Sequence, residues 1–565
     1  MTRRAVLADA GWSLALTLAV VLPLWLGRGF WLVGDMVFVP HQPWKDAWLG
    51  LDGTLPRAVP MDALVSLASH VLPGQVLQRL LLTGGLLLGG IGAGRLVART
   101  SWPAHAAAIA LFLWNPWVDE RLGIGQWAIL LGYLALPWVA LAARRMRADP
   151  RDWGPAAVVL VVSAVCSPSS GVMAVSTLLV LGVGARTWWR IVLVGIVANL
   201  TWAVPAASAT TAKVTTTGVF AGFAARGESR AGVLPSLLSL GGIWKTSIVP
   251  DARTSTLVVL LSCALSIAAL AGLARWGRDD RGEAVRLAVL GAGALLVALM
   301  PVLPGGDTVL ERLGDHVPGL ALLRDSHRFL APLGLVLAVG VAAAVTEVRG
   351  RIGVGRESLW GVVGLLVVAP VLLLPGMAWG LGGWLQASSY PPSWDAVASR
   401  IAGGPGTTVV LPWTGSYRAF GWAQGRAVLD PAPRYLPGDV LVDDRTYLTD
   451  QVVPAEDPRS ESVRAALATR DPVAALRSLH VRWVLVEGGL GVRPTPSELV
   501  GHGAHRSYAG GGLVLLDLGA PPAAGAPTRS AMPTLATHRD LVLAGHAATL
   551  LLLFSGCLFI LRYRK

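Results

Sequence analysis

The stretch FWLVGDMVFVPHQPWKDAWLG (Phe30–Gly50) follows directly on an apolar N-terminal segment. It contains Asp35, His41, Lys45 and Asp46 together with three tryptophans. A charged, tryptophan-rich segment beside an apolar helix is typical of the boundary between a bilayer and water. The stretch therefore predicts a membrane helix followed by an outer loop. The number of such apolar segments along the chain then determines the number of membrane helices in the fold.

The composition indicates a membrane protein. Of the 565 residues, 53% are hydrophobic and 14% are charged, whereas soluble proteins carry about 25% charged residues. Apolar runs of roughly 20 residues recur, long enough to cross a bilayer core of about 30 Å. The net charge of +13 lies largely in arginine clusters of short loops at alternate ends of these runs, the positive-inside pattern. The charge therefore indicates contact with membrane lipids and no nucleic-acid partner.

The runs predict an α-helical polytopic protein of the plasma membrane with about twelve spans and with both termini in the cytoplasm. Residues 1–384 form the transmembrane domain, with an outer loop at 34–75. Residues 385–538 form an extracytoplasmic domain, and residues 539–565 form the last span and a basic tail. The predicted spans are 11–33, 76–97, 103–118, 124–143, 154–167, 171–185, 190–207, 255–274, 285–303, 327–346, 358–384 and 540–561.

The polar block 385–538 is predicted to be an independent α/β domain. TTVVLPW (Thr407–Trp413), RWVLVEG (Arg482–Gly488) and GGLVLLDLG (511–519) have the pattern of short buried strands. ESVRAALATR (461–470) and PVAALRSLHV (472–481) have helical periodicity. A proline-rich stretch at 429–439 predicts a fixed loop at the edge of a sheet, and 520–534 a linker back to the membrane. No motif of a nucleophile, phosphate loop or metal site is present, so binding or capping is the expected role.

The outer loop 34–75 is predicted to contain two short amphipathic helices in the headgroup plane. In QPWKDAWLGL (42–51), Trp44 and Trp48 fall on one helical face, and in PMDALVSLASHVL (60–72) the apolar residues follow the same spacing. These helices would leave Asp35 at the outer end of the first span. Membrane anchoring explains the tryptophans, but it does not explain this carboxylate.

The acidic residue after span 1, followed by juxtamembrane helices, resembles the GT-C glycosyltransferases. LWNPWVDERLGIGQWAILLGYLALPW (Leu113–Trp138), LLRDSHRFLAPLGL (Leu322–Leu335) and a late exported domain further resemble the actinobacterial arabinofuranosyltransferase-like branch. The resemblance implies a polyprenyl-phosphate sugar donor and an extracytoplasmic envelope glycan or lipid as acceptor. It also implies that Asp35 is the catalytic base, although here it lacks the adjacent second acid that many family members have.

The residue types near the outer surface suit this chemistry. A carboxylate can accept the proton of an attacking sugar hydroxyl, and cationic groups can stabilise a departing lipid phosphate. For the donor phosphate we expect Arg324, His327 and Arg328, which precede the tenth span. For substrate contacts the candidates are His41, Lys45, Asp46, Asp119, Glu120 and Arg121.

Two other functions compete with transfer. A transporter or flippase for a lipid-linked or envelope component would favour ionisable groups at mid-membrane and repeated halves, whereas here the acids gather in the outer loops. A non-catalytic scaffold that binds envelope glycan would need only the exported domain. The sequence does not identify the sugar, the acceptor or a cofactor, and it gives no set of ligands on which a divalent metal site could be argued.

Overall fold

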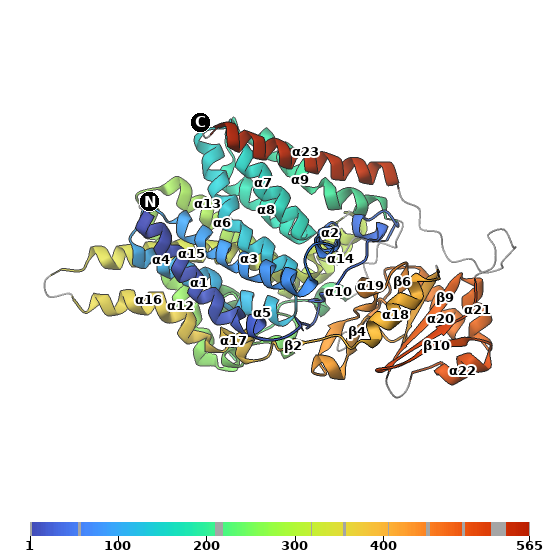
Figure 1. Ribbon diagram of the computed structural model, residues 1–565. Helices are drawn as coiled ribbons and strands as arrows, with labels where there is room; N and C mark the ends of the chain where they lie inside the picture. Colours follow the sequence, from blue (N-terminus) through green and yellow to red (C-terminus); the bar gives the residue numbers. More distant parts are fainter. Residues whose placement is uncertain are drawn as a thin grey trace.

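The computed structural model describes residues 3–54, 58–209, 218–317, 319–353, 357–404, 406–447, 452–488, 492–520 and 538–563. A bundle of long helices makes up most of the molecule, and a sheet domain lies against one end of it (Figure 1). The first and last helices both have their chain ends at the opposite end of the bundle. The predicted linker lies, from residue 521 onward, outside the described residues.

The predicted spans all coincide with helices, but not all of these helices are long. Within the described residues, 8 helices are long and apolar enough to cross a membrane, or 9 if one pair bent by 62° counts as a single span. The eight are α1 (Arg3–Leu26), α3 (Gly74–Leu96), α6 (Trp127–Ala148), α9 (Trp188–Ser208), α12 (Thr256–Trp276), α13 (Arg281–Leu299), α15 (Ala331–Gly350) and α23 (Arg539–Tyr563). The 3-10 segments η4 (Met300–Val302) and η5 (Leu320–Leu330) extend α13 and precede α15.

The other four predicted spans form shorter helices. These are α4 (Trp102–Leu113), α7 (Gly154–Cys166), α8 (Pro168–Gly182) and α16 (Leu359–Leu373), the last bent against α17 (Ala378–Gly382). Even the 15 residues of α8 extend only about 22 Å at about 1.5 Å per residue. Ser167 separates α7 from α8, because it closes the first and caps the second by accepting from the Ser170 amide at 3.0 Å.

Helix α15 lies at the centre of the bundle, where most of its residues are buried. It crosses α12 closely because both helices have glycine at the contact. A Cβ on Gly272 would lie 2.5 Å from the Ala344 nitrogen, and one on Gly340 would lie 2.4 Å from the Ala269 oxygen. Small residues that let two backbones approach are a common basis of helix packing in membranes. This packing fixes η5, the segment before α15 that carries Arg324, His327 and Arg328.

The sheet domain contains a mixed sheet with the strand order β10-β11-β9-β3-β6. Strand β3 (Thr407–Leu411) runs parallel to β9 (Val481–Glu487) and to the edge strand β6 (Val440–Leu441), while β11 (Leu513–Asp517) and β10 (His505–Gly510) complete it in antiparallel pairing. Helices α18 (Ser393–Ala402), α20 (Arg459–Leu467) and α21 (Pro472–Ser478) surround the sheet. The predicted α/β character of the block is confirmed.

Smaller elements complete the two parts. The helical part adds η1 (Asp46–Leu49), α2 (Met61–Ser69), α5 (Pro116–Gly123), α10 (Val219–Gly222), α11 (Val233–Leu238), η2 (Thr246–Ile248), η3 (Asp251–Thr254), α14 (Gly306–His316) and η6 (Pro375–Met377). The sheet domain adds the hairpin β4 (Tyr417–Ala419) and β5 (Ala427–Leu429), and also η7 (Gly421–Ala423), α19 (Ala432–Tyr435), β7 (Thr446–Tyr447), β8 (Val452–Val453) and α22 (Pro496–Gly501). Strand β1 (Phe30–Trp31), just before the outer loop, pairs with β2 (Ala387–Ser388) at the start of the sheet domain.

The prediction of two amphipathic helices in the outer loop is wrong for the first. Only the single 3-10 turn η1 forms there, and it begins after Trp44, so the two tryptophans do not share a helical face. The second helix, α2, is present, but its predicted apolar stripe is divided. Polar Asp62 and Ser66 are buried with Met61, whereas Leu64 and Leu67 are exposed. The polar face is buried because Arg434 of the sheet domain forms an ion pair with Asp62 at 3.0 Å.

Candidate functional site

Asp35 lies in a tight turn that requires glycine on both sides of a close backbone contact. The Met36 amide donates to the Val33 carbonyl at 2.9 Å, and the Asp35 amide donates to the Ile124 carbonyl at 3.1 Å. Gly34 has φ +51°, and a Cβ there would lie 1.9 Å from the Ile124 oxygen. Gly125 has φ +82°, and its Cβ would lie 2.0 Å from the Val33 oxygen. The outer loop and the turn before α6 are therefore held in one fixed arrangement.

The half-buried Asp35 carboxylate has partners from two distant segments. The Gln126 amide donates to Oδ2 at 3.3 Å, and the Tyr417 hydroxyl of the sheet domain donates to Oδ1. Lys245 lies close enough to interact electrostatically: burial lowers the pKa of its amine, while the negative charge of Asp35 raises it. Asp35 thus lies where three parts of the chain meet, with a cation beside it.

The short helix α5 carries the acidic and basic triad between α4 and α6. Asn115 caps the helix by accepting from the Val118 amide at 3.1 Å, and Pro116 occupies its first position, as the N-terminal preference of proline predicts. Asp119, Glu120 and Arg121 are all buried. The helix therefore places three ionisable groups within the protein, so each must be neutralised or paired there.

Arg121 connects this helix to the segment before α15. Its guanidinium donates to Gln126, to His327 Nδ1 and, at 3.3 Å, to Asp325 Oδ2. Gln126 in turn donates to Asp35, so a continuous chain of contacts runs from Asp35 to Asp325 and His327. Two stretches that the sequence analysis singled out separately, around Asp119 and around His327, thus meet at one place.

The three residues predicted to hold a donor phosphate do not lie together. His327 is fully buried between Glu120, at 3.5 Å, and the Gly241 carbonyl, at 3.1 Å. Arg328 forms an ion pair with Asp325 at 2.8 Å and keeps 26% of its side chain exposed. Arg324 points to the sheet domain, where it lies 3.4 Å from Glu456 and over the ring of Phe223. Of the three, Arg328 is both attached to the cluster and open to solvent.

A second ion pair lies beneath α5. Arg253 and Glu228 have fully buried side chains and form a two-pronged contact, and Arg253 also donates to the Ser239 hydroxyl at 2.7 Å. Burial and the nearby Glu228 charge raise the pKa of Asp119 to about 7. The same two causes raise the pKa of Glu120. Within the described residues the Asp119 carboxylate has no hydrogen bond or ion pair, so near neutral pH it can both accept and donate a proton.

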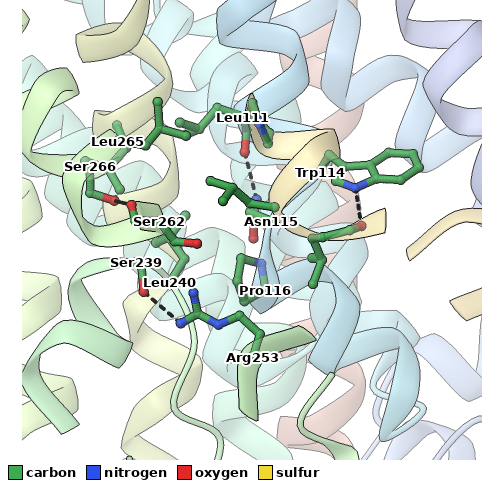
Figure 2. Close-up of a pocket in the computed structure, with 14 residues that line it drawn as sticks. Leu111, Trp114, Asn115, Pro116, Ser239, Leu240, Arg253, Ser262, Leu265 and Ser266 are labelled. Carbon is green, nitrogen blue, oxygen red and sulfur yellow. Dashed lines mark hydrogen bonds between the residues drawn. The ribbon is translucent and has the colours of Figure 1, made fainter. Parts of the chain in front are cut away.

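Arg253 also borders a small cavity between α4, α11, α12, α15 and α16, shown in Figure 2. The cavity has a volume of about 30 Å³ and is lined largely by leucines, with Asn115, Ser239, Ser262 and Ser266 among them. It is large enough for a water molecule. Arg253 Nη1 has no hydrogen-bond partner among the described residues.

The other candidate substrate contacts lie away from Asp35. His41 donates from Nδ1 to the Ser69 carbonyl at 3.0 Å, and Asp46 forms an ion pair with Arg539 at 2.7 Å. Lys45 donates to the Pro433 carbonyl at 2.6 Å, and burial lowers the pKa of its amine to about 7. In the part of the chain that the structure describes, none of the three side chains has a hydrogen bond or ion pair to Asp35. Lys45 and Asp46 hold the outer loop against the sheet domain and α23, whereas His41 makes a contact within the loop.

Several site residues were not found from the sequence. Gln126 is a polar residue inside the quoted stretch Leu113–Trp138, at the start of the predicted span 124–143, and a polar side chain at that position was a usable signal. Lys245, Glu228 and Arg253 come from the outer segment 208–254, where no motif marks them. Tyr417 lies 382 positions from Asp35, and no local pattern connects the two. Over the described ranges, no group of three or more His, Cys, Asp or Glu residues could hold a metal ion.

Comparison with known proteins supports the fold. A scan against family models finds no match, and neither does a search of curated proteins. Two solved structures of the arabinofuranosyltransferase AftD from mycobacteria, one of them a mutant, match 92% of this chain with 18% and 17% identity and TM-scores of 0.53 and 0.51. The chain spans about two fifths of their length, 40% and 42%. The chain therefore has an AftD-like fold.

Proposed function

We propose that this protein is a membrane glycosyltransferase that moves a sugar from a polyprenyl-phosphate donor to an envelope glycan or lipid acceptor. One observation carries the proposal. In an AftD-like fold, a carboxylate in the outer loop belongs to a continuous polar network, and this network ends at an arginine whose side chain is partly exposed to solvent. Asp35 starts this network, and Arg328 ends it. By likeness to AftD, arabinofuranose is the first sugar to test.

The reaction follows from these positions. The acceptor hydroxyl gives its proton to the Asp35 carboxylate while its oxygen bonds to the anomeric carbon of the sugar. The bond from that carbon to the phosphate oxygen breaks, and the electron pair leaves with the polyprenyl phosphate. Arg328 and Lys245 offer positive charge to this leaving group. His327 is fully buried, so its role is to fix Arg121 rather than to touch the donor.

The arrangement of the chain favours an extracytoplasmic site. Both chain ends lie at the end of the bundle that is opposite the sheet domain (Figure 1). The arginine-rich short loops, which the positive-inside rule assigns to the cytoplasm, connect helices such as α6 to α7 and α12 to α13. We therefore place the termini in the cytoplasm and the outer loop, Asp35 and the sheet domain outside it.

The test is Asp35→Asn in the full-length protein in lipid nanodiscs, assayed with a panel of labelled polyprenyl-phosphate sugars. Loss of a general base lowers rates by about 10²–10⁴-fold, and we expect a loss in this range. Asp52→Asn, in the same loop, is the matched control, because among the described residues the hydrogen bonds that the Asp52 carboxylate accepts all come from Thr54. A folded Asp35→Asn protein at full rate excludes Asp35 as the base. A wild-type protein that transfers no sugar from any donor favours the scaffold or transporter function instead.

A further inference from the structure

The sheet domain reaches into the candidate site with one side chain. Tyr417, in β4, donates its hydroxyl to Asp35 Oδ1. The binding or capping role expected for this domain does not require such a contact. Tyr417 keeps 42% of its surface exposed, so it reaches the carboxylate from the open side of the site, where an acceptor must also approach.

The backbone fixes this contact. The Gly34 amide donates to the Ala427 carbonyl at 2.9 Å, and the Leu429 amide donates to the Gly34 carbonyl at 2.8 Å. Leu429 is the partner of Tyr417 in the β4–β5 hairpin. The outer loop is thus paired with one strand of the hairpin, and the other strand places Tyr417 beside the residue that follows Gly34. The position of Tyr417 follows from strand register and does not depend on the rotamer of a surface side chain alone.

The hairpin is anchored from behind by a buried charged group. Arg418, next to Tyr417, contacts Glu487 of β9 at 3.0 Å and Asp430 at 3.4 Å. Burial and the charge of Asp430 raise the pKa of Glu487, and burial raises the pKa of Asp430. Burial thus disfavours the charged form of both carboxyl groups, while the Arg418 charge favours it. These ion pairs join the hairpin to β9 and so fix the strand that carries Tyr417.

We propose that Tyr417 is a positioning residue of the active site: it holds the Asp35 carboxylate in the orientation needed to accept the acceptor proton. The inference rests on the proposed function of Asp35. An ionised carboxylate has about four acceptor positions. Tyr417 takes one on Oδ1 and Gln126 one on Oδ2, which leaves room for the acceptor hydroxyl. The site is then complete only when the outer loop and the sheet domain are joined.

The experiment compares Tyr417→Phe with Tyr447→Phe in the full-length protein. Tyr447 belongs to the same domain, is 49% exposed, and its hydroxyl has no hydrogen bond in the described chain. Loss of a hydrogen bond that orients a base should lower kcat about tenfold, while the KM for the acceptor changes less than about twofold. Tyr447→Phe should match the wild type. An increase in KM at constant kcat would make Tyr417 an acceptor contact and overturn the inference, as would unchanged or faster turnover.

A second readout needs no substrate. A water-soluble carbodiimide with an amine nucleophile labels accessible carboxyl groups, and mass spectrometry gives the fraction of Asp35 that is modified. Without the Tyr417 hydroxyl, labelling of Asp35 at one fixed pH should rise severalfold, and Tyr447→Phe should leave it unchanged. Unchanged labelling in Tyr417→Phe refutes the pairing. If labelling rises but the wild type transfers no sugar, the pairing stands and the proposed function of Asp35 fails.

Discussion

Gly34→Ala tests whether the backbone contact beneath Asp35 controls transfer. Gly34 has φ +51°, and a Cβ added there would lie 1.9 Å from the Ile124 oxygen. An ordinary van der Waals contact needs at least 3.4 Å. The outer loop must therefore move away from the turn before α6 by about 1.5 Å, and the hydrogen bond from the Asp35 amide to Ile124 is lost with it.

The size of the effect follows from this displacement. A shift of about 1 Å in a catalytic group costs on the order of 10²-fold in rate, so we expect a loss of at least this size in kcat. Alanine in the left-handed region adds about 1–2 kcal/mol of strain, and the lost hydrogen bond about 1 kcal/mol. The free energy of unfolding should thus fall by about 2–3 kcal/mol, a change that leaves most small domains folded.

The assay is sugar transfer in nanodiscs, with thermal unfolding measured on the same samples. Gly84→Ala is the matched control, because a Cβ on Gly84, within α3, meets nothing within 4 Å. Alanine at an unhindered helix position stabilises by about 0.5–1 kcal/mol, so Gly84→Ala should keep its full rate. If Gly34→Ala transfers sugar at the wild-type rate, the fixed turn is not what places the base, and the reasoning is refuted.

Two further predictions concern the buried charges. Arg253→Met leaves the Glu228 carboxylate buried without its partner, so it should cost about 3–5 kcal/mol of stability; adding Glu228→Gln should recover most of the loss in thermal unfolding. Burial raises the pKa of Glu487, so folding favours the protonated carboxyl. The protonated carboxyl therefore contributes to the free energy of unfolding at low pH, and this stabilisation is lost as the pH rises from about 4.5 through the pKa of the folded state. Glu487→Gln should therefore flatten the decline of the unfolding midpoint with rising pH, and an unchanged slope would contradict the assignment.

The apolar runs located the helices, because burial in lipid requires long uninterrupted hydrophobic segments. The apolar runs did not predict the length of a helix where a polar residue interrupts the run, as Ser167 does between α7 and α8. In the site, the charged residues of α5 and of the segment before α15 were found from the sequence. Ionisable residues next to membrane spans cost free energy and are therefore rare, so they stand out against the apolar runs. Arg324 points away from this site because it faces Glu456 of the sheet domain.

The sequence alone could not distinguish substrate contacts in the outer loop from contacts that hold the loop to distant segments. Lys45 and Asp46 looked like substrate contacts, yet their partners, Pro433 and Arg539, lie far along the chain. Tyr417 was missed for the same reason, since its neighbour depends on the pairing of a hairpin with a loop. Contacts between distant segments depend on strand register, which no local pattern specifies.

The pairing of Gly34 with the β4–β5 hairpin also sets an order for biogenesis. Tyr417 lies 382 residues after Asp35, which at about 5–20 residues per second corresponds to roughly 20–80 s of synthesis. During this interval the early helices have already left the ribosome, while the outer loop still lacks its partner strand. The nascent protein therefore enters the membrane before Asp35 can contact Tyr417, and this contact forms only after the late sheet domain has folded and docked.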